Sequence, residues 1–323
     1  MDYLLGKGPS GFGSASTAME VASQYEDKSQ SVSTKIFLIT GANVGIGLET
    51  ARALFANGGT VIMACRSKAA MSEAAESIKQ SCTGSSKAGT ILEMECDLSS
   101  MESVRAFAKA FIATKMPVHA LICNAGIMAP PDFLTSADGW EMQIATNHLG
   151  HFLLVNLLRD QLKAAGTSRV VCVSSMAHKG TPSTGVDYQS LKQDAPHPYA
   201  GVTHYCQSKL ANMLHAQELS KRCQAQGVNC VAVSLHPGVI NSALGRHRAL
   251  FKWLYWIGDV LRFTKSIEQG AATNVYCALA TDVTPGRFYA DCNEQETPHA
   301  ALSEARAVEL WEFSSEATKS DWN

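Results

Sequence analysis

The sequence predicts an α/β fold: a single domain built around one doubly wound parallel sheet of about seven strands, with helices on both faces. Short apolar runs rich in β-branched residues recur along the chain, and stretches with helical spacing separate them. Strands that alternate with helices favour a parallel sheet, because each helix returns the chain to the same end of the sheet. The expected strands are 35–40, 60–65, 90–96, 118–123, 169–174, 229–235 and 287–291, and the clearest helices are 47–56, 100–113 and 141–162.

The predicted domain begins at residue 34. Residues 1–33 are rich in Gly and Ser, so we expect an arm outside the core, whereas residues 34–323 contain no internal repeat and no linker. The chain of 323 residues is 46% hydrophobic, which is enough for one large core. Its net charge of −2, with 17% charged residues, indicates neither a nucleic-acid partner nor disorder.

Cysteine usage and the N-terminus bound the setting. The ten cysteines form no C-x-x-C pair, and several lie in apolar runs. They are predicted to be buried thiols in a reducing compartment, not disulfides or metal ligands. The sequence contains no run of 18 apolar residues, so we expect no transmembrane helix. Residues 1–33 lack the apolar core of a secretory signal and carry four acidic residues and no arginine, which is atypical of an ordinary transit peptide.

A glycine-rich turn follows the first predicted strand. The segment "TGANVGIGLET" places Gly41, Gly45 and Gly47 between a strand and a helix. Glycines there let the backbone approach a pyrophosphate, and the helix N-terminus offers free N–H groups. The spacing is G-x-x-x-G-x-G and not G-x-G-x-x-G, but its position favours a dinucleotide site over a structural turn. The expected contacts include the intervening Asn43, Val44 and Ile46.

The end of the second predicted strand indicates which dinucleotide binds. An acidic residue there would accept a hydrogen bond from the ribose 2′-hydroxyl of NAD, but the chain has Arg66, followed by Ser67 and Lys68. A guanidinium suits a 2′-phosphate. We therefore expect NADP(H); the alternative is an ordinary solvated arginine.

Two further strand ends converge on the same edge of the sheet. The third strand is followed by Asp97 and Leu98, where the carboxylate could meet the adenine. The fourth is followed by Asn124, Ala125 and Gly126, which leave room for the cofactor. Ligands of open α/β sheets bind at the carboxyl ends of strands. Turn chemistry alone is the alternative for either segment.

Six motifs together resemble the short-chain dehydrogenase/reductase superfamily, which has a Rossmann fold. They are "TGANVGIG", "NAG", "NHLGHF", "VSS", "YCQSK" and "HPG", in the family's order over residues 35 to about 240. The resemblance implies hydride transfer with Tyr205 as acid/base, Lys209 and Ser175 as its partners and Asn147 completing a tetrad. It also implies cofactor contacts from Tyr205, Lys209 and the end of the sixth strand: Pro237, Gly238 and Val239.

The chemistry agrees with these roles. Tyr205 and Lys209 are four residues apart in a stretch with helical spacing, which places them on one face. A phenol has a pKa near 10. An ammonium about 4 Å away would stabilise the phenolate by up to ~4 kcal/mol at an effective dielectric near 20 and lower that pKa by up to ~3 units. Ser175 would steady the developing charge on the substrate oxygen. Without the flanking motifs, a surface tyrosine, a turn serine and a structural amide would be the simpler interpretations.

Narrower resemblances suggest the setting. "ACR" and "NHLGHF" resemble the branch of retinol dehydrogenases and light-dependent protochlorophyllide reductases. The stretches "GKGPSGFGSASTAMEV" and "QGAATNVYCALA" resemble plant dehydrogenases associated with the import translocon of the chloroplast inner envelope. That resemblance implies a chloroplast location, at the inner envelope or in the stroma, with the cytoplasm as the alternative. The chain departs from many relatives at Asn43-Val44, where some NADP-binding members have a basic residue, and in "VINSAL", which lacks a threonine.

Three functions follow as hypotheses. The leading one is an NADP(H)-dependent oxidoreductase that acts on a hydrophobic carbonyl or alcohol. The second is an NADPH-sensing regulatory subunit of a plastid envelope import complex with little turnover, and the third is an enzyme similar to protochlorophyllide reductase.

The region after "HPG" is expected to form a substrate lid over residues 239–265. Within it, residues 246–265 combine an apolar surface that includes Trp253 and Trp256 with a basic stripe. A lid packed over an apolar pocket is one interpretation. The other is a peripheral contact with a membrane, with aromatic rings at the headgroups and cations toward anionic lipid.

Overall fold

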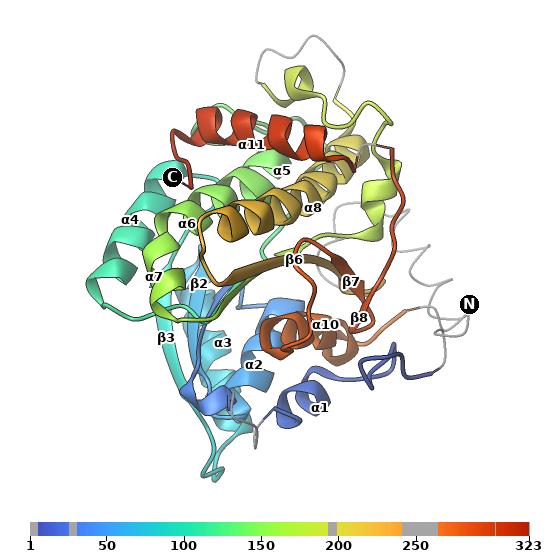
Figure 1. Cartoon of the computed structure of the whole chain (residues 1–323). Coiled ribbons are helices and arrows are strands. Elements are labelled where there is room, and N and C mark those ends of the chain that lie inside the picture. The colour runs from blue at the N-terminus through green and yellow to red at the C-terminus, as the bar shows by residue number, and fades with distance from the viewer. Residues whose placement is uncertain (1–5, 26–30, 193–198, 241–263, 301, 323) are drawn as a thin grey trace.

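The computed structural model describes residues 6–25, 31–192, 199–240, 264–300 and 302–322 (Figure 1). Its sheet has eight strands in the order β3-β2-β1-β4-β5-β6-β7-β8. The first seven are parallel and β8 is antiparallel to β7, which confirms the predicted parallel sheet and adds one short strand. The strands are β1 (Ile36–Thr40), β2 (Thr60–Cys65), β3 (Thr90–Glu95), β4 (Ala120–Cys123), β5 (Ser168–Val173), β6 (Cys230–His236), β7 (Phe288–Ala290) and β8 (Asn293–Glu294).

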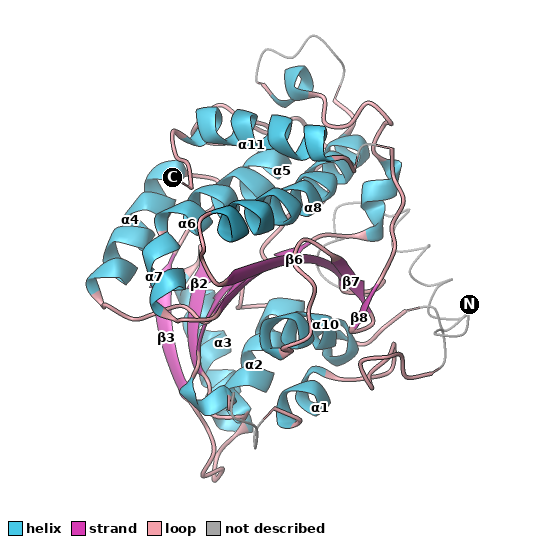
Figure 2. Cartoon of the chain, in the orientation of Figure 1, coloured by secondary structure: helices cyan, strands magenta, loops and turns pink. Residues whose placement is uncertain are grey.

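Helices cover both faces of the sheet, as Figures 1 and 2 show. Alternating side chains of β1 point to opposite faces, so Phe37 and Ile39 enter one core and Leu38 the other. One face is covered by α2 (Gly45–Ala56), α3 (Lys68–Ser81) and α10 (Ile267–Leu279), and α1 (Ala18–Ser23) packs on the outside of α10 and α2. The other face is covered by α4 (Met101–Ala113), α6 (Gly150–Leu157), α7 (Arg159–Ala164) and α8 (Gly201–Ala225), and α5 (Met142–Ile144) and α11 (Glu304–Thr318) pack on these helices.

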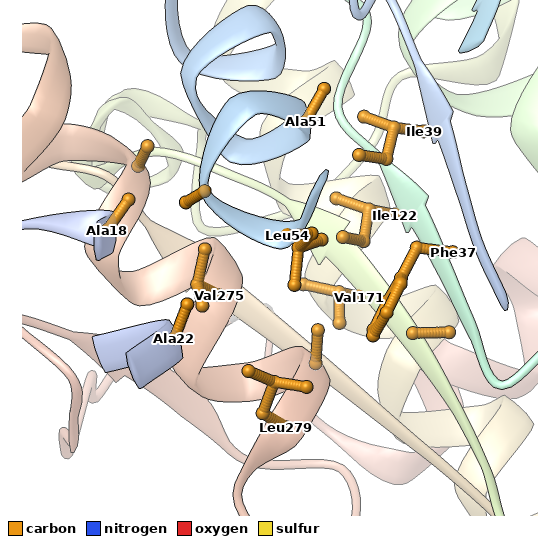
Figure 3. Close-up of a cluster of buried hydrophobic side chains, with 14 of the residues drawn as sticks. Ala18, Ala22, Phe37, Ile39, Ala51, Leu54, Ile122, Val171, Val275 and Leu279 are labelled. Carbon is orange, nitrogen blue, oxygen red and sulfur yellow. The ribbon is translucent and has the colours of Figure 1, made fainter. Parts of the chain in front are cut away.

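The N-terminal segment differs from our expectation of an arm outside the core. Ala18, Val21 and Ala22 of α1 are buried against α10 and α2, and Figure 3 shows Ala18 and Ala22 beside Val275 of α10. Phe12 is buried with its ring edge-on to Tyr276, 6.1 Å between centroids. These small apolar side chains follow helical spacing, so one stripe of a short helix can close the outer side of α10.

The single helix expected over 141–162 is interrupted. The structure has α5, then a π-helical turn (Ala145–Leu149), then α6 and, after Leu158, α7. Gly150 follows the π turn and packs so closely on Leu98 that a Cβ would overlap the Leu98 carbonyl. A π turn within a helix commonly marks a functional position. This one contains Asn147.

Helix α8 is long and almost wholly enclosed. One of its sides faces β5 and β6, and the C-terminal helix α11 lies across another (Figure 1). Ala307, Leu310 and Trp311 of α11 are buried there. Because α8 is held from both sides, the residues on it have fixed positions relative to the sheet.

The strand order places a ligand crevice between β1 and β4. From β1 the chain proceeds outward to β2 and β3, and from β4 it proceeds the opposite way to β5 and β6. The carboxyl ends of β1 and β4 therefore form the topological switch point, where doubly wound sheets bind ligands. No helix in the described ranges is long and apolar enough to span a bilayer.

Candidate active site

The glycine-rich turn lies at the switch point. Thr40 ends β1 and α2 begins at Gly45, so the turn joins strand to helix as the sequence predicts. Gly41 and Gly45 have φ values of +66° and +58°, which favour glycine. A Cβ at Gly47 would overlap the Gly41 carbonyl and the Asn124 amide.

This turn fits a dinucleotide. The N-cap residue of α2, Val44, makes no side-chain hydrogen bond to the helix and is 51% exposed. The first amides of this 12-residue helix therefore have no side-chain cap, and a Cβ at Gly45 would meet open space. Free N–H groups beside open space suit a phosphate group. Asn43 and Ile46, the other predicted contacts, are partly exposed in the same turn.

Arg66 immediately follows β2 and is exposed, as are Ser67 and Lys68. The Ser67 side chain caps α3 by accepting from the Ala70 amide at 3.3 Å. Arg66 thus lies at the carboxyl end of β2, and its contact with a 2′-phosphate stays a prediction.

The end of β4 is tied to the end of β1. The side-chain amide of Asn124 donates to the Thr40 carbonyl at 2.9 Å. The backbone amides of Asn124 and Ala125 both donate to the Thr40 hydroxyl at 3.0 Å. The segment with Gly126 is thereby held beside the glycine-rich turn.

Asp97 has local partners. Its carboxylate accepts from the Ser99 amide at 2.9 Å and from the Ser99 hydroxyl at 2.7 Å, while the next residue, Leu98, is buried. The carboxylate lies at the end of β3, two strands from the switch point. A contact between Asp97 and the adenine stays a prediction.

Tyr205 and Lys209 lie on one face of α8, near its N-terminus. Both are nearly buried, at 7% and 4% exposure. The Lys209 ammonium lies 5.5 Å from the centre of the Tyr205 ring. The pairing expected from the sequence is therefore present, and the cation approaches the ring of the phenol.

The Lys209 ammonium is anchored to the sheet. It donates to the Val173 carbonyl at 3.0 Å, and the Asn212 side chain donates to the same oxygen at 3.0 Å. Burial of the ammonium lowers the pKa of Lys209 from 10.5 to about 8. The proton on Lys209 is therefore held less firmly than on a surface lysine.

The two serines after β5 have different surroundings. The Ser174 hydroxyl is buried and donates to the Lys209 carbonyl at 2.6 Å. Ser175 is partly exposed, and its hydroxyl accepts from the Ala177 amide at 3.1 Å, as the N-cap of a short 3-10 helix. Of the two, Ser175 is the one that a substrate can approach.

Asn147 lies in the π turn and is fully buried. Its side-chain oxygen accepts from the Ile127 amide at 2.8 Å, and its nitrogen donates to the Ile127 carbonyl at 3.0 Å and the Ser208 hydroxyl at 2.9 Å. A Cβ at Gly126 would lie 3.1 Å from Asn147 Oδ1 and 3.6 Å from Lys209 Nζ. The turn after β4, the π turn and α8 therefore meet at Gly126.

The segment after β6 closes the site on another side. Gly238 has φ +102°, and a Cβ there would contact the aliphatic part of Lys265. Pro237 precedes it, and Val239 is 49% exposed and accepts from the Lys265 amide at 2.8 Å. Lys265 forms an ion pair with Asp291.

The predicted lid, 239–265, is joined at its ends. Ile240 and Lys265 form a parallel bridge. Residues 241–263, and with them nearly all of the expected membrane-contacting stretch 246–265, lie outside the described residues.

Comparison with known proteins assigns the family. The model of the short chain dehydrogenase family matches residues 35–195. The short-chain dehydrogenase TIC 32 A, chloroplastic, of Brassica napus is 40% identical over 95% of this chain and 94% of its own length. This chain belongs to the short-chain dehydrogenase family. It is thus a member of an oxidoreductase family.

Other short-chain dehydrogenases are similar over most of the chain. Human retinol dehydrogenase 12 is 41% identical over 89% of this chain and 87% of its own. Among solved structures, an uncharacterized protein from Mycobacterium Paratuberculosis is 34% identical, with a TM-score of 0.70 over 91% of this chain and 96% of its own. The L-sorbose reductase of Gluconobacter frateurii shares the fold, with a TM-score of 0.63 at 19% identity over 81% and 96% of the two chains.

Sequence reasoning missed several residues of this short-chain dehydrogenase site. Thr40 fastens the end of β4, Ser208 holds Asn147, and Asn212 shares the acceptor of Lys209. Each stands beside or within a motif, and position next to a motif was the available signal. In the described part of the chain, no three His, Cys, Asp or Glu residues lie close enough to hold a metal ion. Nine of the ten cysteines are buried, as predicted.

Proposed function

We propose that this short-chain dehydrogenase transfers hydride between NADP(H) and a hydrophobic carbonyl or alcohol. The observation that supports this most directly is the pair of Tyr205 and Lys209. They share one face of α8 beside the switch point, with the Lys209 ammonium 5.5 Å from the phenol ring. An acid/base group beside a cation is what carbonyl reduction requires.

The cofactor would lie against the carboxyl ends of the strands. The α2 N-terminus would bind its pyrophosphate, and the segments Asn124–Gly126 and Pro237–Val239 would flank its nicotinamide half. Bound NADPH supplies the hydride. The protein's own part is to orient the dinucleotide and manage the proton.

The proton would come from Tyr205. In the reduction direction the phenol would donate its proton to the developing alkoxide, and in oxidation the phenolate would accept it. The Lys209 ammonium, held by Val173, would stabilise the phenolate. The partly exposed Ser175 would donate a hydrogen bond to the substrate oxygen.

Asn147 would hold the other tetrad residues in position without contacting the substrate. Its side chain has all of its hydrogen-bonding partners within the protein: Ile127 and Ser208. We therefore assign Asn147 the role of holding the turn after β4 against α8, and we assign contact with the substrate oxygen to Tyr205 and Ser175.

The preference for NADP(H) over NAD(H) rests on Arg66. Arg66 is exposed immediately after β2, with Lys68 two residues further on, and the residues that directly follow the strand include no carboxylate for a ribose hydroxyl. A guanidinium can bind a 2′-phosphate through two parallel hydrogen bonds.

A hydrophobic substrate is favoured by the side chains around the tetrad. Single exposed apolar residues are ordinary on a protein surface. Here, however, three of them stand beside motif residues: Met176 after Ser175, Val202 one turn before Tyr205, and Val239 after "HPG", at 36%, 42% and 49% exposure. The similarity to retinol dehydrogenase 12 supports the same substrate class.

A second candidate is an NADPH-sensing subunit of a plastid envelope import complex with little turnover. The similarity to two chloroplastic TIC 32 proteins of Brassica napus supports this candidate and a chloroplast location. Tyr205 argues for chemistry, because a sensor needs no acid/base group.

The deciding experiment is NADPH oxidation by the purified protein with a panel of aldehydes and ketones of increasing chain length, including retinal and matched polar carbonyls. We expect turnover that rises with apolar chain length. Binding of NADPH without turnover on any carbonyl would favour the sensor. A rate that requires light and a porphyrin pigment would favour the third hypothesis, protochlorophyllide reduction.

A further inference from the structure

A buried histidine joins two parts of the site. His151 lies in α6, one turn after Asn147, and is 1% exposed. Its Nδ1 is 3.0 Å from the carbonyl oxygen of Asn147. Its Nε2 is 2.8 Å from the hydroxyl of Thr40 at the end of β1.

The partners determine the direction of these hydrogen bonds. A carbonyl oxygen only accepts, so Nδ1 of His151 carries a hydrogen and donates to Asn147. In a neutral imidazole the other nitrogen is then an acceptor, so the Thr40 hydroxyl donates to Nε2. The lone pairs of that hydroxyl remain available to the amides of Asn124 and Ala125, which donate to it at 3.0 Å.

We infer that His151 is a positioning residue that couples the Asn147 turn to the cofactor-contacting segment after β4. The inference rests on the proposed function, because it assigns that segment to the cofactor. A continuous series of bonds runs from the Asn124 and Ala125 amides through Thr40 and His151 to Asn147. Because the imidazole ring is rigid, a shift of the Asn147 turn displaces Thr40, and with it the amides that Thr40 holds.

The surroundings favour the neutral ring that this arrangement needs. Burial lowers the pKa of His151 to about 4, against the opposing effect of its bond to Asn147. Lys209 and His215 on α8 lower it further, and His148 lies one turn away. The coupling should therefore persist through the neutral pH range.

Variants of His151 can separate its two bonds. His151→Asn keeps an amide near the position of Nδ1 and loses the hydrogen bond with Thr40. His151→Gln keeps an amide near the position of Nε2 and loses the hydrogen bond with Asn147. Phe keeps the ring volume and loses both bonds. The matched control is His119→Phe, since His119 accepts from the Ile36 amide at 3.0 Å, at the opposite end of the same strand β1.

The first test needs no turnover. Long-range ¹H–¹⁵N NMR spectra of the full chain with labelled histidine report the tautomer of each ring, and the His151 signal is the one lost in His151→Phe or His151→Asn. We expect a neutral ring protonated on Nδ1 from pH 6 to pH 8. A ring protonated on Nε2, or one that is charged at pH 6, would overturn the inference.

The second test measures function in the same variants. We expect His151→Phe to slow single-turnover hydride transfer by about tenfold, as loss of buried hydrogen bonds predicts, while His119→Phe stays within about twofold. His151→Asn and His151→Gln should fall between. Equal losses in His151→Phe and His119→Phe would reduce His151 to a merely structural residue.

A double-mutant cycle then tests the coupling itself. If Thr40 and His151 act together, removing His151 from a protein that already lacks the Thr40 hydroxyl should have little further effect. The NADPH dissociation constant of the double variant, Thr40→Val with His151→Phe, should then match that of the single variant Thr40→Val within about twofold. Multiplicative effects would refute the coupling while leaving the proposed function intact. If the wild-type protein bound no NADPH, the proposed function itself would fail, and this inference with it.

Discussion

Lys209 donates a 3.0 Å hydrogen bond to the carbonyl oxygen of Val173, the last residue of β5. Val173 precedes Ser175 by two residues, so the bond holds the ammonium near the end of β5. The ammonium also lies beside the Tyr205 ring. The acceptor is neutral, so burial of the charge is only partly compensated, and the pKa of Lys209 falls to about 8. The position from which Lys209 is proposed to act on Tyr205 therefore costs stability.

Lys209→Met should make the cofactor-free protein more stable at pH 7. The pKa of Lys209 is about 8 in the folded chain and 10.5 in the unfolded chain, so the unfolded state binds more protons between these values. The cost of the buried charge is constant below pH 8 and disappears as the pH rises to 10.5. We expect a gain of ~2–3 kcal/mol in the free energy of unfolding at pH 7, shrinking above pH 8.

Urea unfolding at several pH values measures this gain. The control is Lys221→Met, because the Lys221 side chain is 44% exposed in an ion pair with Glu304. A Lys209→Met protein that is less stable than wild type at pH 7 would contradict the prediction.

Tyr205→Phe removes one hydroxyl and keeps the ring. Turnover should fall by at least ~100-fold, as expected for the loss of a general acid, while the NADPH dissociation constant stays near that of wild type. Tyr276→Phe is the control, since Tyr276 is a buried tyrosine of α10 whose hydroxyl donates to Asp282. Steady-state kinetics and fluorescence titration provide both quantities, and wild-type turnover in Tyr205→Phe would remove Tyr205 from the mechanism.

Arg66→Asp should erase or reverse the cofactor preference. The wild-type protein is expected to bind NADPH more tightly than NADH by about 1.5–3 kcal/mol, from charge-assisted bonds to the 2′-phosphate. Titration with both dinucleotides tests this. Arg287→Asp, at a side chain 64% exposed beside β7, changes the net charge equally and should leave the preference intact. Equal affinity of the wild-type protein for both would make Arg66 an ordinary surface residue.

Asn147→Ala should cost both stability and activity. The substitution removes three hydrogen bonds and leaves the Ile127 amide and carbonyl without their Asn147 partner. We therefore expect the free energy of unfolding to fall by ~2–3 kcal/mol. The loosened turn after β4 should also lower kcat/KM. Asn156→Ala is the control, because the buried Asn156 amide has no hydrogen-bond partner among the described residues. Equal losses of stability in the two variants would contradict the assignment.

Membrane contact through 246–265 stays a prediction, tested by flotation with anionic liposomes at low salt. We expect the wild-type protein to float and the variant with Trp253→Ser and Trp256→Ser to float less, with an unchanged circular dichroism spectrum. A wild-type protein that stays wholly in the soluble fraction would leave the lid as the remaining interpretation.

The strands were predictable because their signals are local. The run 60–65 coincides with β2, and 35–40 differs from β1 by one residue. The described part of 1–33 was misjudged for the opposite reason. Ala18, Val21 and Ala22 have helical spacing, but whether such a stripe is buried depends on α10, which lies far along the chain. The break at Leu158 and the π turn likewise depend on packing between elements.

The sequence by itself determined the fold class, the position of the glycine-rich turn and the Tyr205–Lys209 spacing, because periodicity and turn chemistry act between neighbours in the chain. Only the tertiary structure decided that Ser174 faces Lys209 while Ser175 is accessible, that Asn147 braces Ile127, and that both ring nitrogens of His151 are bonded. These outcomes depend on burial and on hydrogen-bond partners from distant strands and helices, and such partners exist only once the sheet has formed.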